Sequence, residues 1–320
     1  MGDTTATRHL VLLHGMGATG EVWLPWAPLL ERHWPGRWLA PDLAGHGWSP
    51  PLPAYSFEAL AQRTAEGLGP VRLGPNDRLV LLGHSLGGVV ALALAARQRG
   101  LPVDAVVGLG IKVAWSPAEL AKAAELAARP VTWFTTRDEA ARRYLRVSGL
   151  AGLFAPDHPV VDAGLRRENG PGRRGGDQPG DDHRPPTTTV DRRADSRRPP
   201  ASTGNQRGGG RRPPATAGDR RGDGRWSLAT DTATTGDQRG DGRWRLAMDP
   251  AAFAVGAPRL PALLSAVDVP VLLARGERDP MVTDAQLKEL GVPVATLPGL
   301  GHNAHVEDPA AVLALLDAYL

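Results

Sequence analysis

The chain has 320 residues, of which 42% are hydrophobic, so it can bury a sizeable core. Basic residues exceed acidic ones by only 37 to 34, and this balance argues against a nucleic-acid partner. Cysteine is absent, which excludes disulfides, thiolate metal sites and a cysteine nucleophile. No leader-like segment opens the chain and no apolar run is long enough to span a membrane, so we expect a cytoplasmic protein with no membrane contact.

The first 110 residues alternate strand and helix signals. Short continuous apolar runs, typical of strands buried on both faces, lie at residues 9–13, 37–40, 78–82 and 105–109. The stretches between them predict helices near residues 21–30, 57–68 and 86–99. This β-α-β alternation predicts a parallel sheet that is covered by helices.

The composition changes after residue 111. Residues 115–165 are expected to form helices, whereas residues 166–245 hold 18 Arg and 11 acidic residues among many Gly, Pro and Thr. This second stretch has too few aliphatic side chains to offset its conformational entropy. Within it, Arg-Pro-Pro recurs every 14 residues, and a twelve-residue segment ending at Ala229 returns, slightly changed, 18 residues later. We expect a disordered expansion of one loop, of which only the last copy docks on the fold.

Strand and helix signals return towards the C-terminal end of the chain. Strands are expected at 271–274 and 292–297, and helices at 284–290 and 309–320. The predicted organisation is therefore an α/β core made of residues 1–110 and 268–320 and a helical cap made of residues 111–165 and 245–267. The low-complexity segment 166–244 interrupts that cap.

A serine lies in a predicted tight turn between a strand and a helix. The motif Gly83-His-Ser85-Leu-Gly87 lies between the strand at 78–82 and the helix at 86–99. Such a strand–turn–helix forces the serine into strained backbone angles and lifts its hydroxyl clear of the sheet, and it requires small residues on either side. Ser85 is therefore the candidate nucleophile. The alternative is a Gly-rich turn that contains a serine by chance.

A serine nucleophile needs a base, and the base needs a carboxylate to orient it. Asp279 follows the predicted strand at 271–274, and His302 follows the one at 292–297. Both residues should lie at the edge of the sheet where its parallel strands end, which is also the edge that carries Ser85. We expect one ring nitrogen of His302 within hydrogen-bond reach of Ser85 and the other near Asp279.

Five motifs together resemble the α/β-hydrolase superfamily: HGMG after the first strand, DLAGHG after the second, GHSLGG, GERDP and GHNAHVEDP. The order Ser, Asp, His agrees with that family. The resemblance covers residues 9–110 and 268–320 and implies a mostly parallel sheet of about six strands, covered by helices and topped by a cap. It also implies an oxyanion hole formed by the backbone N–H groups of Met16 and Leu86, and no metal or other cofactor.

Other polar residues in or near these motifs are weaker candidates for catalytic or metal-binding roles. Glu277 could replace Asp279 as the acid, but it lies two residues early for the family pattern. His302 and His305 could form a metal pair, but no third ligand cluster accompanies them. Structural roles in turns are expected for four further residues, His14, Asp42, His46 and His84.

The chain departs from the family in two places. Only eight residues precede the first strand, which leaves no room for the antiparallel hairpin that many relatives carry, so we expect six strands that are all parallel. The second departure is the insert, which interrupts the part of the fold that shapes the acyl pocket in relatives. We therefore expect it to affect substrate specificity more than the catalytic residues.

These motifs favour a serine hydrolase that cleaves a carboxylic ester or a related acyl bond of a small molecule through an acyl-enzyme intermediate. Carbon–carbon bond hydrolysis with the same three residues is an alternative. A relative that binds its ligand without turnover is a further hypothesis.

The segment 170–235 should be dispensable for folding. Each doubling of loop length adds only about 0.6 kcal/mol of closure cost, so a deletion that joins Gly170 to Gly236 should melt near the temperature of the full chain or slightly above it. Thermal denaturation measures this directly. Trypsin should cut the native full-length protein in this window before it cuts the core. A deletion that fails to fold, or a window that resists trypsin, would make the segment an ordered part of the cap.

Overall fold

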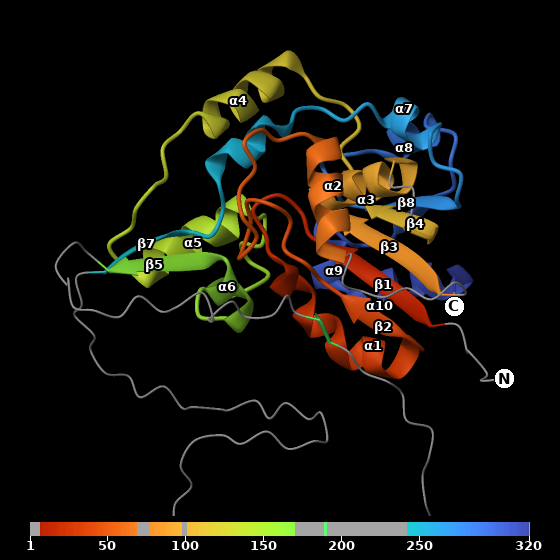
Figure 1. Ribbon diagram of the computed structural model, residues 1–320, viewed down its shortest axis with the longest axis horizontal. Coiled ribbons are helices and arrows are strands. Elements are labelled where there is room, and N and C mark those ends of the chain that lie inside the picture. Colours follow the sequence, from red (N-terminus) through yellow and green to blue (C-terminus); the bar gives the residue numbers. More distant parts are fainter. Residues whose placement is uncertain (1–6, 69–76, 98–100, 170–188, 191–241, 320) are drawn as a thin grey trace, which may run out of the picture. The chain divides into compact units, whose positions relative to one another are not determined.

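A sheet of parallel strands organises the part of the chain that the structure describes, residues 7–68, 77–97, 101–169, 189–190 and 242–319. In this computed structural model (Figure 1), six described strands run parallel in the order β2-β1-β3-β4-β8-β9. The mostly parallel sheet of about six strands is therefore confirmed. Its strands are β1 (Arg8–Leu13), β2 (Arg37–Leu39), β3 (Arg78–His84), β4 (Val103–Leu109), β8 (Val271–Gly276) and β9 (Val294–Leu297).

One further strand of this sheet is antiparallel. β6 (Thr189–Val190) pairs with β2 in the register Trp38↔Val190 and Leu39↔Thr189. The expectation that all strands would be parallel was therefore wrong. Among the parallel strands β2 lies at the edge, so its outer backbone groups are open to pairing with a short extended segment.

Helices cover both faces of the sheet (Figure 1). Along β1, Val11 and Leu13 belong to one buried cluster while Leu10 and Leu12 belong to the other, because successive side chains of a strand point to opposite faces. This explains why the strand is a continuous apolar run. The first cluster contains residues of α2 (Phe57–Leu68), α3 (Leu86–Arg97), α7 (Leu260–Leu264) and α8 (Asp284–Lys288). The second contains residues of η1 (Gly20–Trp26), α1 (Ala27–His33), α9 (Ala304–Glu307), α10 (Pro309–Leu313) and η4 (Ala314–Tyr319).

The cap combines helices with a two-stranded ladder. Its helices are α4 (Pro117–Ala127), α5 (Arg137–Val147), α6 (Pro159–Ala163) and the 3₁₀ helix η3 (Pro250–Val255). Capping boxes formed by Ser116 with Glu119 and by Thr136 with Glu139 fix where α4 and α5 begin. The ladder pairs β5 (Leu165–Asn169) with β7 (Gly242–Leu246) in antiparallel register.

The ladder lies at the two ends of the predicted insert. Its last pair of residues is Asn169 and Gly242, so the chain leaves and re-enters the described cap at neighbouring positions. In β7, Trp244 exchanges two backbone hydrogen bonds with Phe134, at 2.7 and 2.9 Å. Regular structure therefore extends further into the segment 166–244 than its composition indicates. The predicted disorder falls mostly on residues 170–188 and 191–241, which lie outside the described residues. The proposed deletion, which joins Gly170 to Gly236, would also remove the described strand β6.

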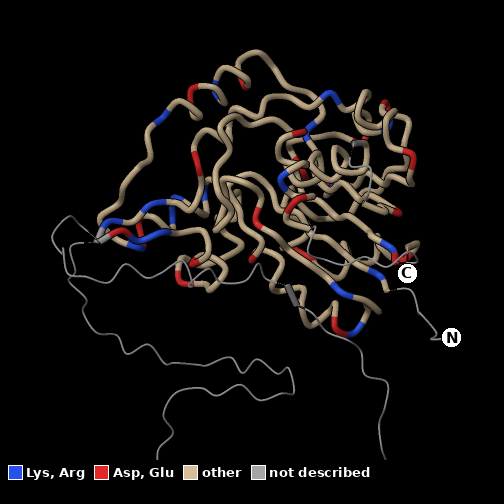
Figure 2. The backbone as a smooth tube through the Cα atoms, viewed as in Figure 1, with Lys and Arg blue, Asp and Glu red and all other residues tan. Residues whose placement is uncertain are grey.

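The cap is docked on the loop that follows β2. The amide of Gly47 donates to the carbonyl of Ala247 at 2.7 Å, and the Asp249 amide donates to Gly45 at 2.7 Å. The guanidinium of Arg166 stacks 3.7 Å from the ring centre of Trp48. Figure 2 shows that basic residues are concentrated along the ladder that supplies this arginine; they are Arg166, Arg167, Arg243 and Arg245. These contacts fix the cap above the edge of the sheet where the parallel strands end.

Candidate active site

Ser85 occupies a strained turn between β3 and α3. Its φ of +51° makes it the one non-glycine residue with positive φ in the described part of the chain. A side chain at Gly83 would place its Cβ 2.2 Å from the Gly87 carbonyl, and one at Gly87 would lie 2.3 Å from the Leu13 carbonyl. The Ser85 amide donates to the carbonyl of Leu109 at 2.7 Å, which ties the turn to the next strand. The sharp turn expected from the Gly83–Gly87 motif is therefore present.

Asp279 and His302 form a hydrogen-bonded pair. The loops after β8 and β9 bring the Asp279 Oδ2 to 3.0 Å from the His302 Nδ1. Asp279 is only 4% exposed, and its Oδ1 accepts from the Met281 amide at 2.8 Å. With Nδ1 directed at the carboxylate, the Nε2 of His302 is left to act as a base. Gly110 packs against the pair, where a Cβ would lie 3.3 Å from the imidazole ring.

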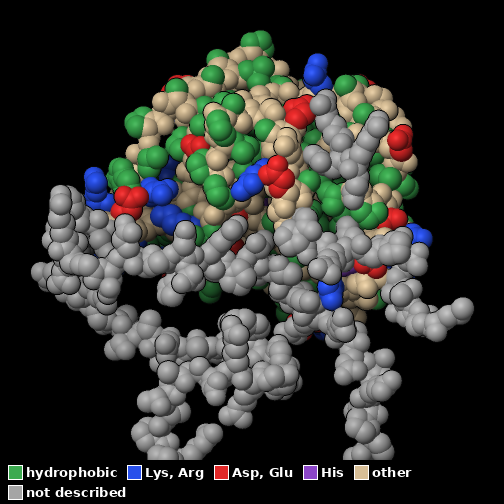
Figure 3. Space-filling model, viewed as in Figure 1, with side chains coloured by type: hydrophobic (Ala, Val, Ile, Leu, Met, Phe, Trp, Pro, Cys, Tyr) green, Lys and Arg blue, Asp and Glu red, His purple; other side chains and the backbone are tan. Residues whose placement is uncertain are grey.

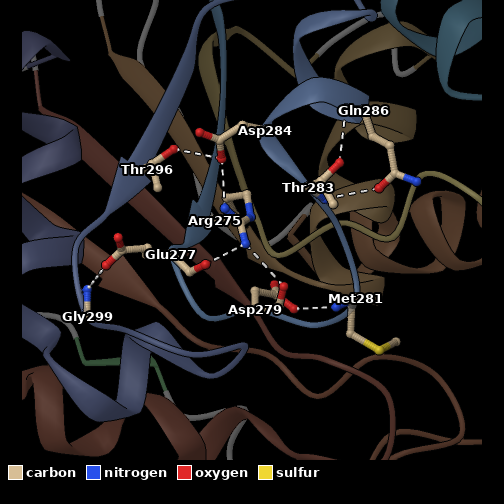
Figure 4. A network of polar contacts seen from close by, with 9 residues as sticks. All are labelled: Arg275, Glu277, Asp279, Met281, Thr283, Asp284, Gln286, Thr296 and Gly299. Atoms are coloured by element: carbon tan, nitrogen blue, oxygen red, sulfur yellow. Dashed lines mark hydrogen bonds and ion pairs between the residues drawn. The ribbon is translucent and has the colours of Figure 1, made fainter.

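A buried arginine organises the loop that carries Asp279 (Figure 4). Arg275, which is 8% exposed, donates to the backbone carbonyls of Glu277 at 2.8 Å and Asp279 at 3.1 Å. It also pairs with Asp284 at 2.7 Å and holds the pKa of that carboxyl below its ordinary value. The role of Arg275 was not predicted from the sequence, although an arginine at the end of a buried strand is an unusual feature that could have indicated it.

Glu277, the other acidic candidate, makes a hydrogen bond to the loop that precedes His302. Its Oε2 accepts from the Gly299 amide at 2.7 Å (Figure 4), three residues before His302. Its carboxylate is exposed, in contrast to the buried carboxylate of Asp279. The geometry therefore gives Asp279 the contact with the histidine and Glu277 a role in the loop that precedes it.

His84 and Asn303 support the histidine loop. The buried His84 ring lies 4.8 Å from the His302 ring, and its Nε2 is 3.0 Å from the His302 carbonyl. Asn303 donates to the carbonyl of Gly149 at 2.9 Å, which links this loop to the end of α5 in the cap. Ser85 follows His84 directly and therefore lies at the same edge as His302. Within the described residues the Ser85 hydroxyl makes no hydrogen bond, so its contact with His302 stays a prediction.

Leu86 and Met16 carry the two backbone N–H groups that are expected to form an oxyanion hole. Leu86 is the first residue of α3, where the helix dipole adds positive potential. Met16 lies in the turn after β1. In the part of the chain that the structure describes, neither amide donates a hydrogen bond to a backbone carbonyl. This is the condition that an oxyanion hole requires.

His14, Asp42 and His46 stabilise the turns around the site. The Nε2 of His14 accepts from the Leu43 amide at 2.9 Å. Asp42 accepts from the amides of Gly20 and Trp48, each at 2.8 Å, and so joins the turn after β1 to the turn after β2. The structural roles expected for these residues agree with this geometry.

Four histidines are buried in the described structure below and beside the site, in addition to the more exposed His302. Burial lowers the pKa of His14 to about 4, and it lowers the pKa of His46 and of His305 to about 3. Burial also holds the pKa of His84 well below its ordinary value. The ring of His305 packs against Trp23 and His84, and neither of its nitrogens has a hydrogen-bond partner among the described residues. All four residues are therefore neutral in the folded protein at pH 7.

Comparison with known protein families matches residues 8–309 to the α/β hydrolase fold. The chain belongs to the α/β-hydrolase family. Solved structures agree with this fold. The thioesterase domain from the curacin biosynthetic pathway has a TM-score of 0.59 at 18% identity, covering 98% of this chain and 92% of that domain. E-2-(acetamidomethylene)succinate hydrolase has a TM-score of 0.59 at 19% identity, covering 98% and 91%.

Curated relatives match a shorter part of the chain. A pimeloyl-[acyl-carrier protein] methyl ester esterase from Klebsiella pneumoniae is 42% identical over 87 residues, which are 27% of this chain and 30% of that protein. A 2-hydroxy-6-oxo-2,4-heptadienoate hydrolase from Pseudomonas putida is 36% identical over 100 residues, which are 30% and 34%. The matched segments thus span about a third of these relatives. None of the helices in the described residues has the length and apolar character needed to cross a membrane.

The matched pair Asp279→Asn and Glu277→Gln tests which carboxylate serves His302. Asp279→Asn should lower kcat for ester hydrolysis by about 10³–10⁴-fold, because the amide favours the wrong imidazole tautomer and cannot stabilise the imidazolium. Glu277→Gln keeps an acceptor for the Gly299 amide and should change kcat less than about tenfold. Steady-state kinetics with a chromogenic ester gives both values. A larger loss in Glu277→Gln than in Asp279→Asn would reverse the assignment.

Acid should destabilise the protein well before its carboxylates are protonated. The buried histidines have a lower pKa in the folded than in the unfolded chain, so the unfolded chain binds more protons between about pH 6.5 and pH 4. Stability should therefore fall as the pH drops below about 6.5, by roughly 1.4 kcal/mol per pH unit for each buried histidine. Urea unfolding at several pH values measures this slope.

The substitution His305→Phe should reduce the loss of unfolding free energy per pH unit at acidic pH, because it removes one of these titrating groups. The exposed His33, changed to Phe in the same way, provides the control and should leave the slope as it is. An unchanged slope in His305→Phe would mean that this ring is not held neutral by the fold.

Proposed function

We propose that this chain is a serine hydrolase that cleaves a carboxylic ester or a related acyl bond of a small molecule. The observation that carries this proposal is the 3.0 Å contact between Asp279 and His302, at the same edge as a serine held at a φ of +51°. A strained serine beside an oriented imidazole is the arrangement that activates a hydroxyl for acyl transfer. The proposed roles are nucleophile for Ser85, general base for His302 and orienting acid for Asp279.

The proposed reaction has two halves. In the first, the Nε2 of His302 takes the proton of Ser85 as Oγ attacks the ester carbonyl, and the Asp279 carboxylate stabilises the imidazolium. The negative charge on the carbonyl oxygen is met by the amides of Met16 and Leu86. The intermediate collapses, and His302 returns the proton to the departing alcohol. Water then attacks the acyl-enzyme in the same way and releases the carboxylic acid.

The cap formed by residues 111–165 and 245–267 is proposed to shape the acyl pocket. It is docked above the sheet edge through the loop after β2, and Asn303 joins it to the histidine loop. The names of relatives support an ester as substrate, since the Klebsiella pneumoniae protein is a methyl ester esterase. We place the reaction in the cytoplasm, as predicted from the sequence, and involve no cofactor in it.

A panel of p-nitrophenyl esters tests the proposal. The native chain should release p-nitrophenol, and Ser85→Ala should lower kcat by at least about 10³-fold while leaving the melting temperature near that of the native chain. The exposed Ser265, changed to Ala, is the matched control and should keep full activity. Binding of esters without release of p-nitrophenol by the native chain would favour a ligand-binding protein instead. Full activity of Ser85→Ala would place the nucleophile elsewhere.

Carbon–carbon bond hydrolysis is the second candidate. It is favoured by the similarity to the Pseudomonas putida 2-hydroxy-6-oxo-2,4-heptadienoate hydrolase, which is 36% identical over the matched segment. The same three residues would serve it. Turnover of vinylogous diketone ring-cleavage products, compared with the ester panel on one enzyme preparation, distinguishes the two activities.

A further inference from the structure

The imidazole of His84 packs against the loops that carry the other proposed catalytic groups. It is 4% exposed, and its Nε2 lies 3.0 Å from the His302 carbonyl. Near its other nitrogen, a Cβ at Gly15 would lie 2.7 Å from the His84 Nδ1 and 3.5 Å from the Ser85 Cβ. Gly15 precedes Met16, whose amide is one of the two proposed oxyanion donors. One ring therefore contacts both the loop of His302 and the turn after β1, and its own backbone leads directly into Ser85.

The contact with the His302 carbonyl fixes the tautomer of His84. A carbonyl oxygen only accepts, so the Nε2 of His84 carries the proton and donates the hydrogen bond. Burial holds the pKa of His84 well below its ordinary value, so the ring is neutral at pH 7 and its Nδ1 carries no proton. A charged ring 4.8 Å from the His302 ring would repel the imidazolium that forms there during the proposed reaction. His84 therefore holds the His302 backbone without adding a charge beside the base.

Two further rings are stacked behind His84. The His305 ring lies 4.1 Å from the His84 ring, and the Trp23 ring lies 4.7 Å from that of His305. His305 is 1% exposed, and scarcely any histidine is visible on the face of the molecule that Figure 3 shows. Neither nitrogen of the His305 ring has a hydrogen-bond partner among the described residues, so this ring contributes packing alone. In a close-packed interior such a stack leaves His84 little freedom to move away from His302.

We infer that His84 is a positioning residue for acyl transfer, whose Nε2–H sets the position of His302 relative to Ser85. This inference rests on the proposed function. Residues 84 and 85 are consecutive in one strained turn, so a hydrogen bond from His84 to the His302 backbone joins the nucleophile to the base by a short path. A misplacement of about 1 Å in a reacting group can cost about 10²-fold in rate. The role differs from that of Asp279, which contacts the imidazole itself.

Two substitutions of equal length separate the hydrogen bond from the space that the ring fills. His84→Gln keeps an N–H donor for the His302 carbonyl, whereas His84→Met has a side chain of the same length without a donor. For p-nitrophenyl esters, kcat should fall about 10–100-fold in His84→Met and less than about fivefold in His84→Gln, with KM changed less than about threefold in both. A role in packing alone would lower kcat equally in the two variants, and that result would overturn the inference.

His9→Met is the matched control for the loss of a buried histidine. His9 is 1% exposed, and its Nε2 lies 3.1 Å from the Asp77 Oδ2, near the end of β1 that is remote from the site. This variant should lower the melting temperature and leave kcat within about twofold of the native value. A fall in kcat as large as that of His84→Met would show that losing any buried histidine lowers activity, which would also overturn the inference.

Nuclear magnetic resonance of isotope-labelled histidines tests the contact without turnover. In the native chain His84 should show the Nε2–H tautomer and should not titrate between about pH 8 and pH 5. The resonance of the proton between the His302 Nδ1 and Asp279 should keep its native position in His84→Gln and shift in His84→Met. These signals in a chain that cleaves no ester would contradict the proposed function while leaving the positioning of His302 by His84 in place. An Nδ1–H tautomer of His84 in the native chain would overturn the inference even if His84→Met fails to fold.

Discussion

The close approach of β3 and α3 at Ser85 is the constraint on which the site depends. Gly83 and Gly87 allow the backbones to touch, and their contact holds Ser85 in the left-handed region that a serine rarely adopts. The same turn starts α3 and so presents the amide of Leu86 beside the serine. One packing contact between glycines thus positions the Ser85 hydroxyl and the Leu86 amide together, because they belong to consecutive residues of one rigid turn.

The imidazole and its carboxylate depend on a different kind of support. Their loops are held by polar contacts around the site. Arg275 donates a hydrogen bond to the Asp279 carbonyl, and Glu277 accepts one from the loop before His302. His84 contacts the His302 carbonyl. Around them His14, His46 and His84 make hydrogen bonds without charge, because burial keeps them neutral. With these rings neutral, the charged side chain that contacts His302 in the described residues is Asp279.

Local patterns predicted most of the core and its candidate site. The apolar runs located the strands, and the glycine spacing located Ser85, because both signals depend on neighbouring residues. The features that local patterns did not predict depend on partners far along the chain. The pairing of β6 with β2 and the ladder of β5 with β7 join residues that lie in or beside the low-complexity segment, where composition masks strand signals. The hydrogen bonds of Arg275 likewise cannot be read from the sequence, because they form with backbone carbonyls that only the folded loop brings to its side chain.

The ladder of the cap also allows the length of the inserted segment to change without a change in the shape of the cap. Because Asn169 and Gly242 are ladder partners, the chain leaves and re-enters the described cap at neighbouring positions, while β6 in the same segment pairs with β2. Material of any length whose ends lie close together can be attached there without moving α5 or the loop that holds Arg166 on Trp48. The cap therefore has an insertion point next to the ladder, at which a reporter domain or an affinity handle could be added while β6 is kept.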